Sequence, residues 1–235
     1  MTNSKHIVVT GASSGIGFQT AKLLCIQGHT VFAIARNQEK LETLENEVNE
    51  ESGSLIPIIM DLSSFDKSNF DEAFKSVSKI DILINNAGVL LNKEFLDISE
   101  EDILKVFNLN YISVVKTIQY FHSRLCKSNS AHIVNIGSVG GVTNSVKFPG
   151  LSIYSSSKGA LSILSECLAK DFEQDDISVN CLALGAVNTD MLKQAFPDYQ
   201  AETEPDQMAG FISNFALKNN TVMNGVTQIV SVSNP

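Results

Sequence analysis

Short apolar segments alternate with longer segments of helical periodicity along most of this chain. Most of the short segments are continuously apolar, a pattern typical of parallel strands that are covered on both faces. Seven strands are predicted, over residues 6–10, 30–35, 55–60, 81–86, 131–137, 177–183 and 227–232. The segments between them mostly place apolar residues at helical spacing. This alternation predicts an α/β fold of the Rossmann type, a doubly wound parallel sheet of about seven strands with helices on both faces.

No linker or internal repeat interrupts the alternation, so a single domain covering residues 1–235 is predicted. The longest stretch without a clear pattern is 188–210, which follows the sixth predicted strand. Because folds of this type bind ligands beyond the carboxyl ends of their strands, this stretch is predicted to be a substrate loop. The aromatic residues in and beside this stretch are Phe196, Tyr199 and Phe211. They either line a pocket or pack in the core, and packing is the commoner outcome.

Charge and composition narrow the possible functions. The 235 residues are 43% hydrophobic, enough for one sizeable core. The formal net charge is −9, and Arg36 and Arg124 are the only arginines. Nucleic acid is therefore not expected as a partner, because phosphate binding needs clustered cations.

Other features concern the cellular environment. No run of 18 apolar residues is present, and the N-terminal segment lacks the long apolar stretch of a signal peptide. We therefore expect a cytoplasmic protein without a membrane span. The four cysteines lie far apart and lack metal-ligand spacing, so reduced, mostly buried thiols and no metal site are expected: Cys25, Cys126, Cys167 and Cys181.

The turn between the first strand and the first helix is rich in glycine. The segment VVTGASSGIGFQTA places Gly11, Gly15 and Gly17 at a spacing known from dinucleotide sites. Glycines let the backbone approach a pyrophosphate, and the helix N-terminus directs free N–H groups toward that anion. A purely structural turn is the alternative, but the position in the first strand–helix unit favours nucleotide binding. The remaining predicted cofactor residues of this turn are Ser13, Ser14 and Ile16.

The end of the second strand bears on the choice of cofactor. An acidic residue there would bind the ribose 2′-hydroxyl of NAD, whereas this chain has Ala35 followed by Arg36. A guanidinium suits a 2′-phosphate, so NADP is predicted over NAD, with an ordinary solvated arginine as the alternative. Ser14 is the nearest further polar group, and no second cation is present nearby, so NAD stays possible as cofactor.

Two further strand ends offer candidate cofactor contacts. Asp61, followed by Leu62, either accepts a hydrogen bond from the adenine amino group or caps the next helix, and the pattern favours neither. The segment NNAG, residues 85–88, follows the fourth strand. Ala87 and Gly88 would let a ribose lie against their backbone, and Asn86 beside them is also expected at the cofactor. A bare turn is the alternative.

Together these motifs resemble the short-chain dehydrogenase/reductase family. The resemblance rests on TGASSGIG (10–17), NNAG (85–88), NLNYIS, VNIGS and YSSSK (154–158), which occur in family order. It implies a Rossmann-type domain that binds NAD(H) or NADP(H), with a catalytic set of Asn110, Ser138, Tyr154 and Lys158. It also implies that Thr189 contacts the nicotinamide carboxamide. Two departures are Leu184, where the family commonly has proline, and the absence of a glycine pair in the terminal QIVSVSNP.

The pair Tyr154 and Lys158 lies four residues apart, so both side chains share one helix face. A tyrosine with its ordinary pKa of about 10 is a poor base near neutral pH, and a nearby ammonium should lower that pKa. By the resemblance, Lys158 also holds the nicotinamide ribose, Ser138 stabilises charge on the substrate oxygen, and Asn110 orients a water chain from Lys158. An amphipathic helix with a polar edge is the alternative.

These observations favour an oxidoreductase that transfers a hydride between NADP(H) and a carbonyl or secondary alcohol. Tyr154 would act as general acid or base. Two alternatives are an NAD-dependent epimerase or dehydratase and a non-catalytic NAD(P)-binding regulator. The acidic residues of 188–210 favour a neutral or apolar small-molecule substrate. Broad apolar faces on predicted helices 101–127 and 152–174 suggest a homodimer or homotetramer, through Val114, Val115, Ile118, Phe121, Ile163, Leu164 and Leu168.

Overall fold

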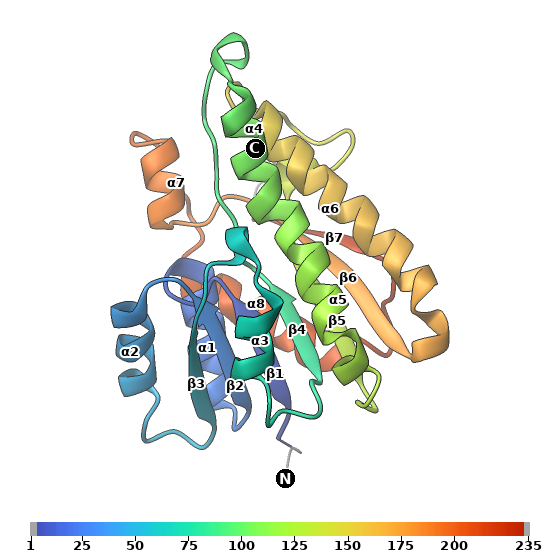
Figure 1. Cartoon of the computed structure of the whole chain (residues 1–235). Coiled ribbons are helices and arrows are strands. Elements are labelled where there is room, and N and C mark those ends of the chain that lie inside the picture. The colour runs from blue at the N-terminus through green and yellow to red at the C-terminus, as the bar shows by residue number, and fades with distance from the viewer. Residues whose placement is uncertain (1–3, 233–235) are drawn as a thin grey trace.

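A computed structural model describes residues 4–232 and shows a parallel sheet with helices packed on both faces (Figure 1). The sheet has seven strands in the order β3-β2-β1-β4-β5-β6-β7, which confirms the predicted fold class. The strands are β1 His6–Thr10, β2 Thr30–Ala35, β3 Ser54–Ile59, β4 Ile82–Asn85, β5 Ala131–Ser138, β6 Ile177–Leu184 and β7 Thr227–Val230. The strand order reverses between β1 and β4, the position where such folds form a ligand crevice.

The helices form two layers, each with its own buried apolar cluster. One layer contains α1 (Gly15–Ile26), α2 (Gln38–Glu47) and α8 (Pro205–Lys218), packed against the sheet through residues such as Leu24, Leu44 and Ile212. The other contains α3 (Lys67–Ala73), α5 (Ser113–Leu125) and α6 (Ser152–Asp171), with Phe70, Phe121 and Leu161 in the core. The remaining helices are α4 (Glu100–Phe107) and α7 (Asp190–Ala195).

Strand β3 departs from the expected pattern of burial on both faces. It forms one edge of the sheet, and only Leu55 and Ile58 of its six residues are buried, while Ile56 is 39% and Ile59 56% exposed. Pro57 lies in the middle of this strand, which an edge position tolerates because one side of the strand needs no N–H donors.

The predicted helix over 101–127 is interrupted. Helix α4 begins with a capping box between Ser99 and Asp102, and one π-helical turn, Asn108–Ile112, separates it from α5. Single π turns often occur at functional sites because the wider turn re-aims side chains. Here the turn contains Asn110, one of the predicted site residues. The predicted helix over 152–174 corresponds to α6, which ends at Asp171.

Most apolar residues that suggested a subunit interface instead face the sheet. Val114, Ile118 and Phe121 are buried in the core, and Leu164 and Leu168 are partly buried against it. Val115 and Ile163 are exceptions: Val115 is partly exposed and belongs to neither apolar cluster, and 59% of the Ile163 surface is exposed. The argument for assembly from these residues was therefore largely wrong, because two helices that lie across a sheet need broad apolar faces for that contact alone.

Three further findings complete the description. Within residues 4–232, no helix has the length and apolar character that crossing a membrane requires. All four cysteines are free, but Cys126 and Cys167 are exposed, contrary to the expectation of mostly buried thiols. The outer residues of the N-terminal segment and of the terminal QIVSVSNP, residues 1–3 and 233–235, lie outside the described residues.

Candidate active site

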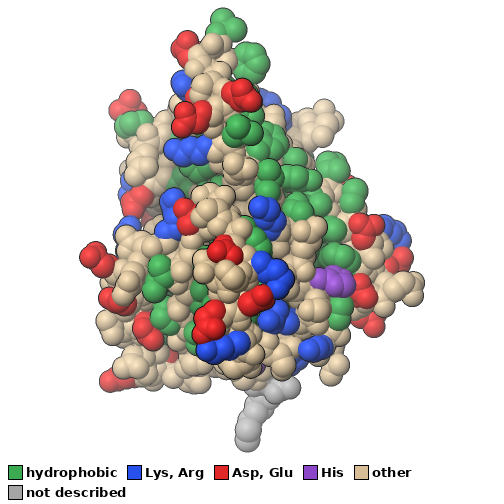
Figure 2. All heavy atoms as spheres, viewed as in Figure 1, with side chains coloured by type: hydrophobic (Ala, Val, Ile, Leu, Met, Phe, Trp, Pro, Cys, Tyr) green, Lys and Arg blue, Asp and Glu red, His purple; other side chains and the backbone are tan. Residues whose placement is uncertain are grey.

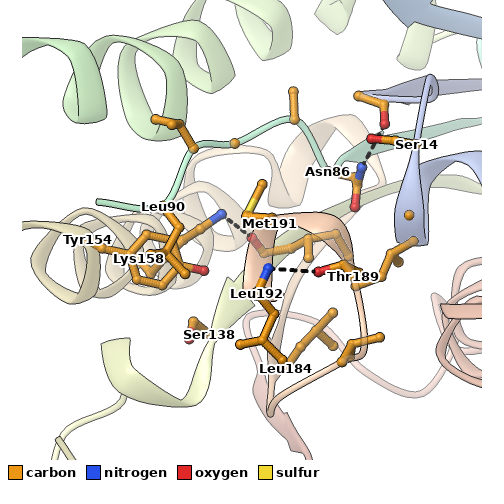
Figure 3. A pocket seen from close by; sticks show the side chains of 18 of the residues that line it. Ser14, Asn86, Leu90, Ser138, Tyr154, Lys158, Leu184, Thr189, Met191 and Leu192 are labelled. Atoms are coloured by element: carbon orange, nitrogen blue, oxygen red, sulfur yellow. Dashed lines mark hydrogen bonds between the residues drawn. The ribbon is translucent and has the colours of Figure 1, made fainter. Parts of the chain in front are cut away.

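A cavity of about 440 Å³ lies at the carboxyl ends of the strands, around the reversal between β1 and β4 (Figure 3). It brings together predicted residues from across the chain. Fifteen of them line it: Gly11, Ser13, Ser14, Gly15, Ile16, Arg36, Asp61, Leu62, Asn86, Ala87, Gly88, Ser138, Tyr154, Lys158 and Thr189. Gly17 and Asn110 do not line it.

The glycine turn is shaped by close contacts that only glycine permits. Gly11 and Gly15 have φ values of 69° and 54°, in the left-handed region. A Cβ atom on Gly11 would lie 2.8 Å from the Cα of Ala87, and one on Gly17 would lie 2.3 Å from the carbonyl oxygen of Gly11. Gly17 therefore allows helix α1 to pack against the turn, while Gly11 and Gly15 line the cavity. The turn and the start of α1 suit a pyrophosphate, because the glycine backbone leaves room for the anion and the N–H groups of the helix N-terminus are directed toward it.

The NNAG segment is fastened to this turn by a residue that sequence reasoning missed. The Thr10 hydroxyl accepts the backbone N–H groups of Asn86 and Ala87, both at 3.0 Å. The Asn86 amide donates to the Thr10 carbonyl at 3.0 Å, and the Asn85 amide donates to the Asn135 side chain at 2.8 Å, tying β4 to β5. NNAG is therefore not a bare turn. A polar residue that ends an apolar strand just before the glycine turn, as Thr10 does, was the available signal.

One end of the cavity holds Arg36 and Asp61. Arg36 follows β2 and is exposed, and within residues 4–232 no hydrogen bond or ion pair involves its guanidinium. Partial burial raises the pKa of Asp61, but hydrogen bonds from Ser63 and the charge of Arg36 outweigh this and hold that pKa below its usual range. Asp61 caps the short helix at Leu62–Ser64 and also lines the cavity, so both interpretations of this residue fit the structure.

The other end holds Tyr154 and Lys158 from α6 and Ser138 from the end of β5 (Figure 3). The Lys158 side chain is buried and its Nζ donates to the Ile136 carbonyl at 2.8 Å. Burial lowers the pKa of this lysine to about 8. The Ser138 hydroxyl accepts the Gly140 N–H at 3.3 Å, which orients it at the strand end. A phenol, an ammonium and a hydroxyl thus meet at one end of the cavity.

The pKa of Tyr154 moves in the opposite direction from the expected one. Burial raises it, and the interaction with Ser138 offsets this rise only in part. The expected net lowering of this pKa is therefore not found: burial outweighs the one group that lowers it, which is Ser138. Because the low-dielectric surroundings disfavour the phenolate, the phenol is protonated near neutral pH and is a proton donor rather than a base in that state.

Asn110 lies beside the cavity and is completely buried. Its Oδ1 accepts the Val89 N–H at 2.8 Å, and its Nδ2 donates to the Val89 carbonyl and to the Ser157 hydroxyl, both at 3.0 Å. A Cβ atom on Gly88 would lie 3.2 Å from Asn110 Oδ1 and 3.4 Å from Lys158 Nζ, so the two side chains approach the same glycine. Asn110 thereby joins the loop after β4 to helix α6.

The stretch 188–210 forms part of the cavity wall. Thr189 caps α7 by accepting the Leu192 N–H at 3.3 Å, and Phe196 and Tyr199 line the cavity. Phe211 instead stacks on Phe215 in α8 and does not line it. Other apolar wall residues, which sequence reasoning did not assign, include Leu90, Val139, Phe148, Leu151, Met191 and Leu192.

The two departures from the family pattern lie close together in space. Leu184 continues β6, pairing with Ser138 of β5 and Val230 of β7, and its side chain lines the cavity. Next to it, a Cβ atom on Gly185 would lie 2.3 Å from the Ser231 hydroxyl, so the chain after β7 packs directly on this turn.

Comparison with known proteins agrees with this architecture. A family model described as short chain dehydrogenase matches residues 5–200. The chain is 33% identical over 192 residues to carbonyl reductase [NADPH] 2 of Sus scrofa, covering 81% of this chain and 75% of that protein. It is 30% identical over 214 residues to fatty acyl-CoA reductase of Acinetobacter baylyi, covering 88% and 71%.

Solved structures of similar fold carry both nicotinamide cofactors. L-sorbose reductase from Gluconobacter frateurii, complexed with NADPH and L-sorbose, has a TM-score of 0.87 at 22% identity, covering 99% of this chain and 97% of that chain. The 3-ketoacyl-(acyl-carrier-protein) reductase from Brucella melitensis, complexed with NADH, has a TM-score of 0.86 at 22% identity, covering 97% and 96%. At these identities the likeness concerns the fold.

Proposed function

Because the chain belongs to the short-chain dehydrogenase family, we propose that it transfers a hydride between NADP(H) and a carbonyl or secondary-alcohol substrate. The observation that carries this proposal is the convergence of Tyr154, Lys158 and Ser138 on one end of a cavity whose wall also includes the glycine turn. When bound, the nicotinamide cofactor would supply or accept the hydride. The protein residues would then supply the proton and the stabilisation of charge.

In the direction of reduction, the phenol of Tyr154 donates its proton to the substrate oxygen as the hydride reaches the carbon. Ser138 donates a hydrogen bond to the same oxygen and stabilises the charge that develops there. The raised pKa of Tyr154 keeps this phenol protonated and ready to donate near neutral pH. Lys158 stabilises the phenolate that forms and binds the cofactor ribose, and in oxidation Tyr154 takes the proton back.

The cofactor that these residues favour is NADP(H). Ala35, at the end of β2, is 7% exposed and lines the cavity, so no carboxylate stands at this strand end to repel a 2′-phosphate. The free guanidinium of Arg36 follows directly and would pair with that phosphate. The glycine turn, NNAG and Thr189 hold the rest of the cofactor, with Asp61 and Leu62 beside the adenine.

The walls around Tyr154 favour an uncharged, largely apolar substrate. Apart from Lys158, the residues that line the cavity offer one cation, Arg36, which lies at the end that we assign to the adenosine. Apolar side chains from α7 and from the segment after β5, such as Met191 and Phe148, cover the substrate end. At the substrate end the only cation is Lys158, which we assign to the phenolate and the cofactor ribose, so an anionic substrate would have no counter-charge of its own, whereas burial of apolar surface stabilises a neutral carbonyl compound.

We further propose that the chain forms one cytoplasmic domain that assembles as a homodimer or homotetramer. Support for assembly now comes from exposed apolar residues, of which only Ile163 was among those first considered. Phe95, Leu96, Leu104 and Ile163 are 67%, 94%, 52% and 59% exposed. They belong to the segment before α4, to α4 and to α6, and Figure 2 shows apolar side chains gathered over this part of the surface.

Replacement of Tyr154 by phenylalanine tests the proposal, since it removes only the hydroxyl. The variant should lose most turnover of an aldehyde and ketone panel while its affinity for NADPH, measured by fluorescence titration, stays near that of the wild type. Loss of a general acid typically lowers the rate about 100- to 10,000-fold. Tyr120→Phe is the matched control, because it removes a phenol hydroxyl outside the cavity. Equal activity of the two variants would rule out the role of Tyr154. Absence of turnover in the wild type despite cofactor binding would favour a regulatory NAD(P)-binding protein.

A further inference from the structure

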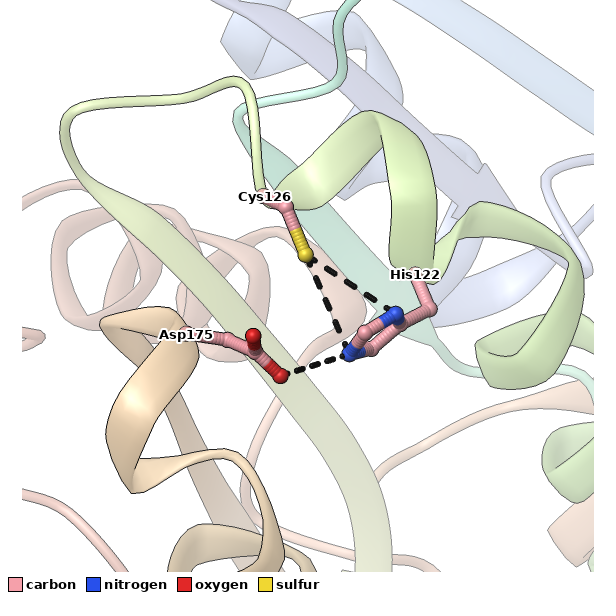
Figure 4. Close-up of side chains that lie close together, drawn as sticks. All are labelled: His122, Cys126 and Asp175. Atoms are coloured by element: carbon pink, nitrogen blue, oxygen red, sulfur yellow. Dashed lines mark hydrogen bonds and ion pairs between the residues drawn. The ribbon is translucent and has the colours of Figure 1, made fainter.

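A second group of chemically reactive side chains lies at the opposite end of the sheet from the cavity. His122 and Cys126 project from the C-terminal end of α5, and Asp175 comes from the short turn Glu173–Asp175 just before β6 (Figure 4). These elements lead into the amino ends of β5 and β6, whereas the cavity lies at the carboxyl ends. The proposed reaction does not use this group.

The possible ligand atoms of the three side chains lie close together. His122 Nε2 lies 2.9 Å from Asp175 Oδ2, and Cys126 Sγ lies 3.8 Å from both ring nitrogens of His122. All three ligand atoms lie within 4.8 Å of one another. Around a tetrahedral zinc ion with bonds of about 2.0–2.3 Å, neighbouring ligand atoms are roughly 3.3–3.7 Å apart. The separations of these atoms lie on both sides of this spacing, so the side chains would reorient to bring all three atoms onto one ion.

The backbone explains why the group forms and why it suits a cation. His122 and Cys126 are four residues apart, so they share one face of α5. Helix α5 ends at Leu125 and α6 at Asp171, so the negative ends of two helix dipoles lie in the segments that carry the group. The Phe172 ring packs on His122 with a centroid distance of 4.7 Å and restricts the imidazole, as an outer shell does in metal sites.

We propose that His122, Cys126 and Asp175 bind one zinc ion, with water in the fourth position. Imidazole, thiolate and carboxylate are the three ligand types that zinc takes in proteins. The ion would join the end of α5 to the turn before β6. His122 and Asp175 in these two segments are 53 residues apart in sequence, and both side chains are partly exposed to solvent. Their direct contact therefore links the two segments only weakly. Its effect would be structural, because the site lies away from the cavity.

Thiol labelling of the full chain provides a direct test, because the other exposed cysteine is an internal control. In the metal-free protein, a maleimide should label Cys126 and Cys167, while buried Cys25 and Cys181 stay unlabelled. One equivalent of Zn²⁺ should protect Cys126 alone, as mapped by mass spectrometry. Labelling of Cys126 that is unchanged by Zn²⁺ would overturn the proposal.

Metal titration of matched variants provides the second measurement. Wild type and Cys167→Ser should bind one Co²⁺ with a thiolate-to-metal charge-transfer band and one Zn²⁺ that displaces it. Cys126→Ser should lose the band, and Cys126→Ser and Asp175→Asn should each bind Zn²⁺ more than about tenfold more weakly. Circular dichroism would show that each variant remains folded. Equal Zn²⁺ affinity in wild type and Cys126→Ser would mean adventitious binding elsewhere and would refute the site.

Discussion

Replacement of Arg36 by alanine should weaken NADPH binding while leaving NADH binding almost unchanged. Arg36 follows β2 at the end of the cavity, and no acidic residue precedes it at the strand end, where Ala35 stands. The guanidinium is therefore the group that we expect to pair with the 2′-phosphate, which NADH lacks. Removal of this side chain should not disturb the fold, because Arg36 is exposed.

The size of the effect follows from the surroundings of Arg36. A hydrogen bond between charged groups contributes about 1.5–3 kcal/mol, and exposure to water favours the lower value. Since 1.4 kcal/mol corresponds to a factor of ten, the loss of NADPH affinity should be about tenfold. The nearby Asp61 carboxylate repels a phosphate. Without the charge of Arg36 this repulsion is no longer balanced, so it should increase the loss of NADPH affinity in the variant.

The assay is a fluorescence titration of both cofactors at fixed ionic strength, since salt screens the phosphate contribution. Lys40→Ala is the matched control, because it removes an exposed cation from α2 that does not line the cavity. The double variant Ala35→Asp, Arg36→Ala should reverse the preference, through ribose binding and repulsion of the 2′-phosphate. Equal affinity of the wild type for both cofactors, or equal weakening of both by Arg36→Ala, would refute the assignment.

Two other predictions concern stability and assembly. His132 is buried, its Nδ1 faces the Ala216 carbonyl at 3.0 Å and its Nε2 faces the Asn180 amide at 3.0 Å, which suits the neutral ring. Burial lowers its pKa from 6.5 to about 4, so the unfolded chain binds a proton at higher pH than the folded one. Urea titrations should show that the free energy of unfolding falls by up to roughly 3 kcal/mol as pH falls from 6.5 to 4. In His132→Gln this free energy should depend less steeply on pH. Light scattering at micromolar concentration should show a dimer or tetramer that Leu96→Glu, at a residue 94% exposed, weakens; a monomeric wild type would contradict the assembly.

Sequence determined the features that depend on neighbouring residues. A strand covered on both faces needs a continuous apolar run, so the strands were found, with their ends shifted by at most a few residues. The glycine turn was recognised because its spacing relates to the first strand and helix alone. Tyr154 and Lys158 share a helix face by virtue of their four-residue spacing, and both line the cavity.

Tertiary structure decided the features that depend on residues far apart in the chain. The raised pKa of Tyr154 reflects its surroundings, which its spacing from Lys158 does not reveal. The role of Asn110 depends on partners that the strand order brings to it, Val89 and Ser157. His122 meets its carboxylate partner 53 residues away for the same reason. The periodicity of apolar residues in the sequence indicates which face of a helix or strand is buried. Only the packing of the helices on the sheet determines which residues that face contacts.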